Sequence, residues 1–277
     1  MTKKLFLFLT VLSLIKMYGQ PANDQMTIIP KWSKGDVKRY QINHSSEAFS
    51  DKPEESSRET QQTSITVIAV KESGLDIVWK YEKANFIDSI PLDNPFKILM
   101  NTLSDNLIVK YTIKKNGTIK SINNYDEISK VIRTRVDSVI DKISKDPTSD
   151  QSKIPTIKFY FQMMFSTNSQ IDEIVLNDIY KYHQLYGSTY FLNKPVSMDE
   201  QPITSTSSRK VNVVLKTVDQ HTKTYRFNGE ILIPGMEEMK SILTYQYSNG
   251  WLQEYTYSLE DNMRVRIKDK YSIKLIN

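Results

Sequence analysis

Polar and apolar residues alternate along several stretches of this chain, and a period of two predicts β-strands that bury one face. The first is Val37–Phe49, which places His44 on its apolar face. Thr63–Lys71 and Leu75–Glu82 follow, and the Ser73-Gly74 pair between them predicts a hairpin. The polar segment Ser50–Gln62 shows no alternation, so we expect a loop there.

A second hairpin is expected at Leu107–Ile122, because Asn116-Gly117 suits the positive φ angles of a tight turn. In Met263–Ile276, apolar residues alternate with basic ones, which predicts one wall facing a core and one facing water. The last third predicts an antiparallel meander with these candidate strands: Thr189–Asn193, Arg209–Val218, Thr222–Ile233, Met239–Ser248, Trp251–Leu259 and Met263–Ile276.

Helical spacing dominates the middle of the chain, about residues 124–187. After Asn124, which with Glu127 resembles a capping box, apolar residues recur every three or four positions. Pro155–Phe165 is apolar nearly all round and predicts a buried helix or the cover of a pocket. We expect a single further helix at Ile171–Tyr186 and a short one at Asn94–Leu103.

This order of elements predicts an α+β fold, a strongly curved antiparallel sheet with about three helices packed on its concave side. Residues 21–277 are expected to form a single β-rich domain, because the helical middle needs a sheet to cover its apolar faces. Pro21–Pro30 is expected to be a disordered lead into that domain.

The first twenty residues have the pattern of a secretory signal peptide: Lys3 and Lys4, an apolar run and a small residue, Gly19. The run is too short to cross a bilayer, and no later segment is long and apolar enough. We therefore expect an exported, soluble protein of the periplasm or the extracellular space. The chain has no cysteine, so it lacks the residue that would carry a lipid anchor.

The composition of the chain argues against several functional classes. The net charge is +5, but the expected signal peptide contains three of the lysines, which leaves 34 basic against 32 acidic residues. That balance does not suit nucleic-acid binding. There are three histidines and no recognisable metal or phosphate motif, so we expect no metal and no cofactor. We assign no catalytic residue, and we expect His183 to have a structural role.

Two groups of residues are candidate binding surfaces. The first is the aromatic and methionine-rich segment Pro155–Phe165, whose Phe and Met side chains form an adaptable surface for a hydrophobic ligand. We expect the lining to be Phe159, Phe161, Met163, Met164 and Phe165, with Trp79 from the sheet. The second is a basic strip on the last strand, which a solvated outer face would also explain. Its members are Arg264, Arg266, Lys268, Lys270 and Lys274.

The layout resembles a family of uncharacterised secreted proteins of the Bacteroidota. The resemblance rests on Tyr18-Gly19-Gln20, the Trp32–Asp36 opening, the Tyr111–Ile119 hairpin before the Asn124 helix, and Gly250-Trp251 in the last meander. It implies a half-barrel similar to the lipoprotein carriers LolA and LolB, a fold that holds acyl chains. It implies no functional residue.

Three hypotheses follow for function. The first is a non-catalytic exported protein that binds a lipid or another hydrophobic ligand in a half-barrel cavity. The second is an envelope structural or interaction protein without such a cavity. The third is a hydrolase of envelope polymers, which would need two carboxyl groups converging in a cleft, at least one with a perturbed pKa. The oligomeric state and the identity of a ligand stay open.

Overall fold

The computed structural model describes residues 25–49, 55–82, 84–88, 95–147, 149–200, 209–232, 240–261 and 266–276. The expected signal peptide lies outside these ranges. The strands are β1 Gln25–Thr27, β2 Val37–Phe49, β3 Glu55–Lys71, β4 Gly74–Tyr81, β5 Asn85–Asp88, β6 Ile108–Ile113, β7 Ile119–Ile122, β8 Thr189–Phe191, β9 Pro195–Asp199, β10 Lys210–Asp219, β11 Thr224–Leu232, β12 Lys240–Ser248, β13 Trp251–Asp261 and β14 Arg266–Leu275. The helices are α2 Pro95–Leu103, α3 Tyr125–Lys145, α4 Ile154–Met164, α5 Asn168–Ile174 and α6 Asn177–His183.

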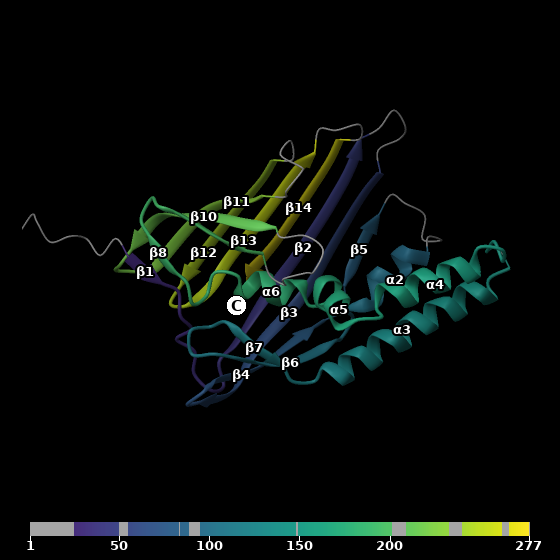
Figure 1. Ribbon diagram of the computed structural model, residues 1–277, viewed down its shortest axis with the longest axis horizontal. Helices are drawn as coiled ribbons and strands as arrows, with labels where there is room; N and C mark the ends of the chain where they lie inside the picture. The colour runs from purple at the N-terminus through teal and green to yellow at the C-terminus, as the bar shows by residue number, and fades with distance from the viewer. Residues whose placement is uncertain are drawn as a thin grey trace, which may run out of the picture.

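Twelve of the strands form one large antiparallel sheet (Figure 1). Its order is β7-β6-β4-β3-β2-β14-β13-β12-β11-β10-β9, and β5 pairs with β3 off this path. Within the described residues the sheet does not close on itself, since β7 and β9 are its two ends. β1 and β8 form a separate two-stranded sheet. The predicted large antiparallel sheet is therefore confirmed.

The first and last long strands are neighbours at the centre of this sheet. β14 pairs with β2 along its whole length, from Arg266 opposite Phe49 to Leu275 opposite Tyr40. As the alternation predicts, Tyr271 and Ile273 of β14 are buried, whereas Lys270 and Lys274 on the opposite face are exposed. This pairing joins segments that are more than 200 residues apart in the sequence.

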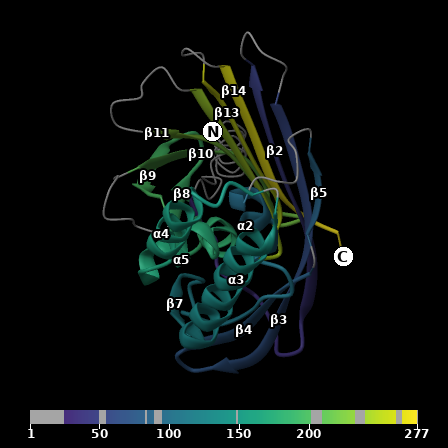
Figure 2. The ribbon, with the colours of Figure 1, turned by 90° about the vertical axis from the view of Figure 1, so that its right-hand side faces the viewer.

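The described helices lie on one side of the sheet, between β9–β11 and β3–β5 (Figure 2). α3 buries the predicted stripe, consisting of Ile128, Ile132, Val136, Val139 and Ile143. Asn124 caps α3 with no side-chain bond to the helix backbone; its amide accepts a hydrogen bond from Lys110 N and donates one to Ile108 O. Asn124 therefore fixes the start of α3 to strand β6.

Several boundaries differ from the sequence-based expectations. The described residues contain five helices, because the expected helix Ile171–Tyr186 is broken into α5 and α6 at Val175 and Leu176. Both of these side chains are buried, and Asn177 and Asp178 follow, residue types that favour helix starts over helix interiors. β3 begins at Glu55, so much of the expected Ser50–Gln62 loop is strand. Within the expected disordered lead, Gln25–Thr27 is strand β1.

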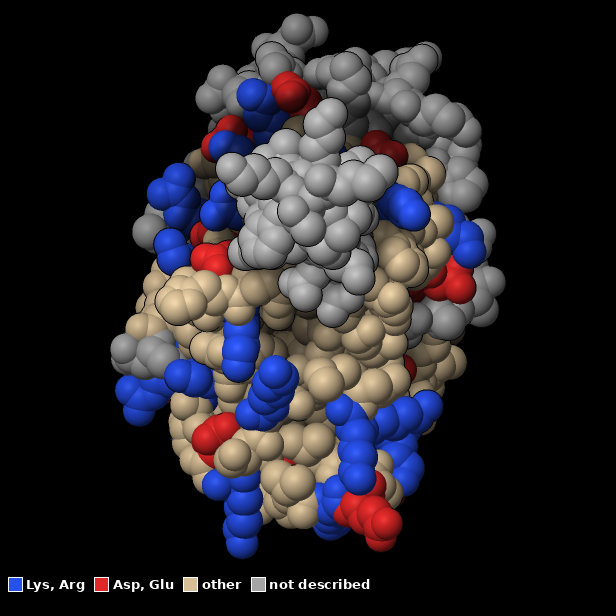
Figure 3. Space-filling view, turned by 90° about the vertical axis from the view of Figure 1, so that its left-hand side faces the viewer, with Lys and Arg blue, Asp and Glu red and all other residues tan. Residues whose placement is uncertain are grey.

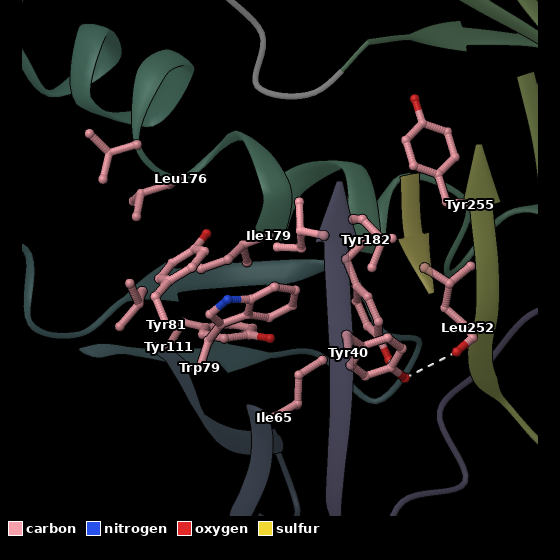
Figure 4. Close-up of a cluster of buried hydrophobic side chains, with 14 of the residues drawn as sticks. Tyr40, Ile65, Trp79, Tyr81, Tyr111, Leu176, Ile179, Tyr182, Leu252 and Tyr255 are labelled. Atoms are coloured by element: carbon pink, nitrogen blue, oxygen red, sulfur yellow. Dashed lines mark hydrogen bonds between the residues drawn. The ribbon is translucent and has the colours of Figure 1, made fainter. Parts of the chain in front are cut away.

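Helix α6 lies in the middle of the core, and its rings contact many strands. Tyr182 packs edge-on against Tyr40 of β2 and Trp79 of β4, with ring centroids 5.3 and 5.5 Å apart. The Tyr40 hydroxyl donates to Leu252 O at 3.0 Å (Figure 4). Tyr40, Trp79 and Tyr182 have no solvent exposure, so the sheet beneath α6 is filled by side chains of the protein itself.

Candidate functional site

Four side chains on neighbouring strands form a row on the face of the sheet that carries α6. Glu59 of β3 is opposite His44 of β2, His44 is opposite Tyr271 of β14, and Tyr271 is opposite Tyr257 of β13. Directly opposed residues of antiparallel strands have Cβ atoms about 4.5–5.5 Å apart. Glu59, His44 and two tyrosines therefore stand side by side on the inner face.

Helix α6 adds two charged side chains to this row. The Tyr271 hydroxyl donates a hydrogen bond to Asp178 Oδ1 at 2.5 Å. The Lys181 ammonium lies 4.1 Å from the centroid of the Tyr271 ring, a cation–π contact. Asp178 and Lys181 are three residues apart, so they share one face of the helix. Tyr271 thus holds the acidic and the basic group of α6 against the sheet.

Tyr81, the last residue of β4, also belongs to this group of side chains beside α6. Its side chain is fully buried, and its ring packs 5.9 Å from Trp79. Figure 4 shows the hydroxyl pointing toward α6. Asp178 of α6 acts on this hydroxyl both through its charge and through a side-chain hydrogen bond. Burial, followed by the negative charge of Asp178, raises the pKa of Tyr81, so the hydroxyl stays protonated.

The carboxyl groups of this site are destabilised in their charged form. Burial raises the pKa of Glu59 to about 7, and the negative charges of Asp178 and Asp105 add to the shift. Burial also raises the pKa of Asp178, against the opposing effects of Tyr271 and Lys181. Burial lowers the pKa of Lys181, and Asp178 opposes that shift. Glu59 can therefore take up or release a proton close to neutral pH.

We name Glu59, His44, Asp178, Lys181, Tyr81 and Tyr271 the inner polar cluster. The sequence analysis missed it, because its members come from four strands and one helix. Glu59 lies in a segment expected to be a loop, and Asp178 lies within the expected helix Ile171–Tyr186. The one sequence feature that indicated this site was His44, a titratable residue on the apolar face of a predicted strand.

His183 is buried and held by hydrogen bonds within the protein. Its Nδ1 donates to Gly117 O at 2.8 Å, and the Tyr111 hydroxyl lies 3.0 Å from Nε2. With Nδ1 as the donor to a carbonyl, Nε2 accepts from Tyr111. Burial lowers the pKa of His183 to about 3, so the ring is neutral. Both ring nitrogens are engaged within the protein.

The structure separates the predicted ligand-binding residues. Phe161 and Phe165 are buried and line a common hollow of about 380 Å³ between α3 and α4. Met164 packs partly buried against the core. In contrast, Phe159 is 59% and Met163 is 50% exposed, so both face solvent.

Trp79, the sheet residue of the same predicted set, lies in the filled core against Tyr81 and Tyr182. The six residues therefore do not form one pocket. Ligand binding by any of them stays a prediction.

The predicted basic strip lies only partly within the described residues. Arg264 is outside them, and of Arg266 only the backbone is described. Lys268 and Lys274 form ion pairs with Glu260 and Glu254 of β13, at 3.7 and 3.8 Å. Lys270 is exposed. On the side of the molecule that carries β1 and β8, lysine and arginine side chains are spread among uncharged residues (Figure 3).

Among the described residues, no group of three His, Asp or Glu side chains is arranged to hold a metal ion. None of the helices in the described ranges combines the length and the apolar character needed to cross a bilayer.

Comparisons with known proteins give little further information. No family model and no curated protein matches the sequence. Among solved structures, the chain is similar to one titled "Lipid-protein interactions in lipovitellin", with 12% sequence identity and a TM-score of 0.49. The match covers 89% of this chain and 26% of the other, so this chain spans about a quarter of that protein. A likeness of this size carries no argument about function.

Proposed function

We propose that this is an exported, non-catalytic protein whose sheet forms a half-barrel of the lipoprotein-carrier type and binds an amphipathic lipid on its inner face. Export is inferred from the signal-peptide pattern of the first twenty residues. The ligand site is inferred from the surface beside α6.

Contacts of α6 support the half-barrel. His183 packs 5.5 Å from Tyr111 of β6, and Tyr186, just after the helix, packs 5.4 Å from Tyr247 of β12. Six strand spacings separate β6 from β12, which would be about 29 Å in a flat sheet. A helix is only about 10–12 Å wide. A strongly curved sheet explains how one short helix contacts both strands.

The observation that carries the proposal is the amphipathic inner face next to α6. On β13, the inward-facing residues include Tyr257 and Leu259, both only partly buried. On β2 and β3, the same face carries His44 and Glu59. A ligand with an apolar body and a polar head matches this division, because each part would meet side chains of its own kind.

Native mass spectrometry of the protein purified from its source tests the proposal. We expect a bound species of lipid mass that organic extraction releases. Leu259→Asp should remove it, because an unpaired carboxylate in the apolar wall is expensive to bury. The matched control is Ser258→Asp, one residue away on the opposite face. If neither native mass spectrometry nor organic extraction of the unaltered protein detects a lipid, the proposal is refuted.

A second candidate function, hydrolysis of envelope polymers, is favoured by the approach of two carboxyl groups with raised pKa, Glu59 and Asp178. Such pairs divide into an acid and a base or nucleophile in glycosidases. The test is release of new reducing ends from cell-wall glycans. Activity that disappears in Glu59→Gln would establish this function, and inactivity of the unaltered protein on such substrates would remove it.

A further inference from the structure

The two end strands of the large sheet line one common hollow, with a volume of about 460 Å³. β7 contributes Ile119 and Ile122 to it, and β9 contributes Met198 and Asp199. Figure 2 shows both strands on the same side of the molecule, away from β3 and β5. None of the lining residues belongs to the inner polar cluster. The two ends of the open sheet therefore approach each other at this hollow.

Two consecutive residues at the end of α6 bind both ends of the sheet. His183 Nδ1 donates to the carbonyl oxygen of Gly117, two residues before β7, at 2.8 Å. Gln184 Nε2 donates to Asp199 O of β9 at 3.0 Å. Consecutive Cα atoms are only about 3.8 Å apart, so one point of the chain reaches both ends. Because β7 and β9 are not paired with each other, a narrow gap separates them.

The backbone of β7 faces this gap. Asn123 N donates to Lys110 O, so these two residues form a hydrogen-bonded pair of the ladder with β6. The next pair is Ile122 opposite Tyr111. Because bonded and non-bonded pairs alternate in an antiparallel ladder, Ile122 directs its N–H and C=O groups away from β6. β7 therefore presents an open edge to the hollow that it lines.

The edge of β9 is open in the same way. Glu200 N donates to Arg209 O, so the alternation turns the backbone groups of Asp199 and Ser197 away from β10. The hydrogen bond from Gln184 to Asp199 O agrees with this orientation. Unpaired edges of this kind are templates for a further strand.

The directions of the strands fit one further strand in the gap. The large sheet has twelve strands, and β5 lies off the order from β7 to β9, which leaves eleven. All neighbours in this order are antiparallel, so the first and the eleventh run in the same direction along the sheet. A closed antiparallel sheet needs an even number of strands. One added strand of opposite direction would therefore be antiparallel to β7 and to β9.

From this arrangement we infer that the gap between β7 and β9 binds an extended segment of another polypeptide, which adds to both edges as a twelfth strand. The open N–H and C=O groups recognise the backbone of the segment. Its inward side chains meet Tyr180 and Ile122, which are both partly buried, and its other side chains face solvent. The segment therefore has apolar residues at alternate positions. This site does not depend on the lipid site of the proposed function.

Peptide titration followed by amide hydrogen exchange, read by nuclear magnetic resonance, tests the inference. The probe is a capped peptide of sequence Lys-Val-Thr-Val-Thr-Val-Lys. We expect the bound peptide to slow exchange of the Ile122 and Ser197 amides. The matched controls are the amides of Asn123 and Glu200, which already bond within the sheet and should not change. The same peptide methylated on its valine nitrogens should bind at least about tenfold more weakly, because it lacks the N–H donors of one edge.

Substitution of Ser197 gives a second test. Ser197→Pro removes one open N–H group from an edge strand that already begins with Pro195, and it should lower peptide affinity about fivefold. Ser197→Ala keeps this N–H group and should bind the peptide as the unaltered protein does.

Three results would overturn the inference: no binding of the peptide, equal affinity for the methylated peptide, or unchanged exchange at Ile122 and Ser197. If exchange at these amides instead slows with rising protein concentration and no peptide, the occupant is a second copy of this chain, and the inference also falls. The exchange experiment uses the unaltered protein, so misfolding of Ser197→Pro would not spare the inference. Detection of bound lipid is a separate measurement, so either site can fail without the other.

Discussion

The inner face of the sheet has two parts that differ sharply, although the same strands run through both. Under α6, the face is packed with fully buried rings, among them Tyr40 and Trp79. Two rows further along β2, the face carries His44 beside Glu59, with Tyr271 and partly buried Tyr257 on the following strands. In the first part α6 packs Tyr182 against the buried rings, and in the second its Asp178 and Lys181 meet polar groups whose charged forms are destabilised.

This difference suggests that the two parts of the inner face have different roles. The filled part supplies stability, because large buried side chains contribute most of the apolar area removed from water. The polar part holds carboxyl groups whose charged forms are destabilised by burial, a property that is common at binding and catalytic sites. Variants that affect only one of the two parts can therefore test the distinction.

The largest effect is expected from Trp79→Ala in the filled part. Removing a fully buried indole ring should lower the free energy of unfolding by about 4 kcal/mol, measured by urea denaturation followed by circular dichroism. The control is Ile242→Ala, since Ile242 is 62% exposed on the outer face, and it should change stability by less than about 0.5 kcal/mol. Similar losses in both variants would contradict a closely packed interior.

A smaller effect is expected in α4, where two phenylalanines two positions apart have opposite surroundings. Phe161→Ala should cost about 3 kcal/mol of unfolding free energy, because the ring is only 3% exposed. Phe159→Ala should cost less than about 0.5 kcal/mol, because its ring is 59% exposed. Equal losses in chemical denaturation would mean that the exposed face of α4 is covered in solution.

The smallest effect is expected in the polar part, from Glu59→Gln, and it depends on pH. The folded state raises the pKa of Glu59 from 4.5 to about 7, so it binds more protons than the unfolded state between these values. Stability from this group is therefore present at low pH and lost as pH rises toward 7. The difference between these two pKa values corresponds to about 3 kcal/mol, and solvent screening of this partly exposed side chain reduces the expected gain in unfolding free energy of Glu59→Gln to about 1–2 kcal/mol across that interval.

The groups that face Glu59 must be considered in this experiment. They are His44 from β2, Asp178 from α6 and Asp105 from the segment before β6, and all three remain in the variant. Comparing the variant with the unaltered protein at each pH cancels their own titrations to first order. A difference that stays constant with pH would show that Glu59 is not held in a destabilising environment.

The regular parts of the fold were predictable because one periodicity decided each of them. Alternation located β2, β4 and β14, and helical spacing located α3 with five of the six residues that it buries. These elements have one face in the core and one in water, so the burial of each residue follows from its position. Short β1, β5 and β9 carry too few residues for such a signal.

The same dependence on alternation explains why the sequence did not predict the candidate site. The first half of β3 turns Ser57, Glu59 and Gln61 toward the inner face, where apolar residues were sought. A strand with polar residues on both faces has the composition of a loop, and it was predicted as one. The failed prediction therefore coincides with the inner polar cluster, where the usual pattern of burial is broken.

The pairing of β2 with β14 has a consequence for the order in which the large sheet can form. Among the strands of this sheet, β2 comes first in the sequence and β14 last, so β2 has an open edge until Arg266–Leu275 is available. Most of the sheet joins near neighbours, but its centre is completed only by this last pairing. A variant that lacks β14 would leave β2 and β13 with unpaired edges, which are prone to pair with other chains.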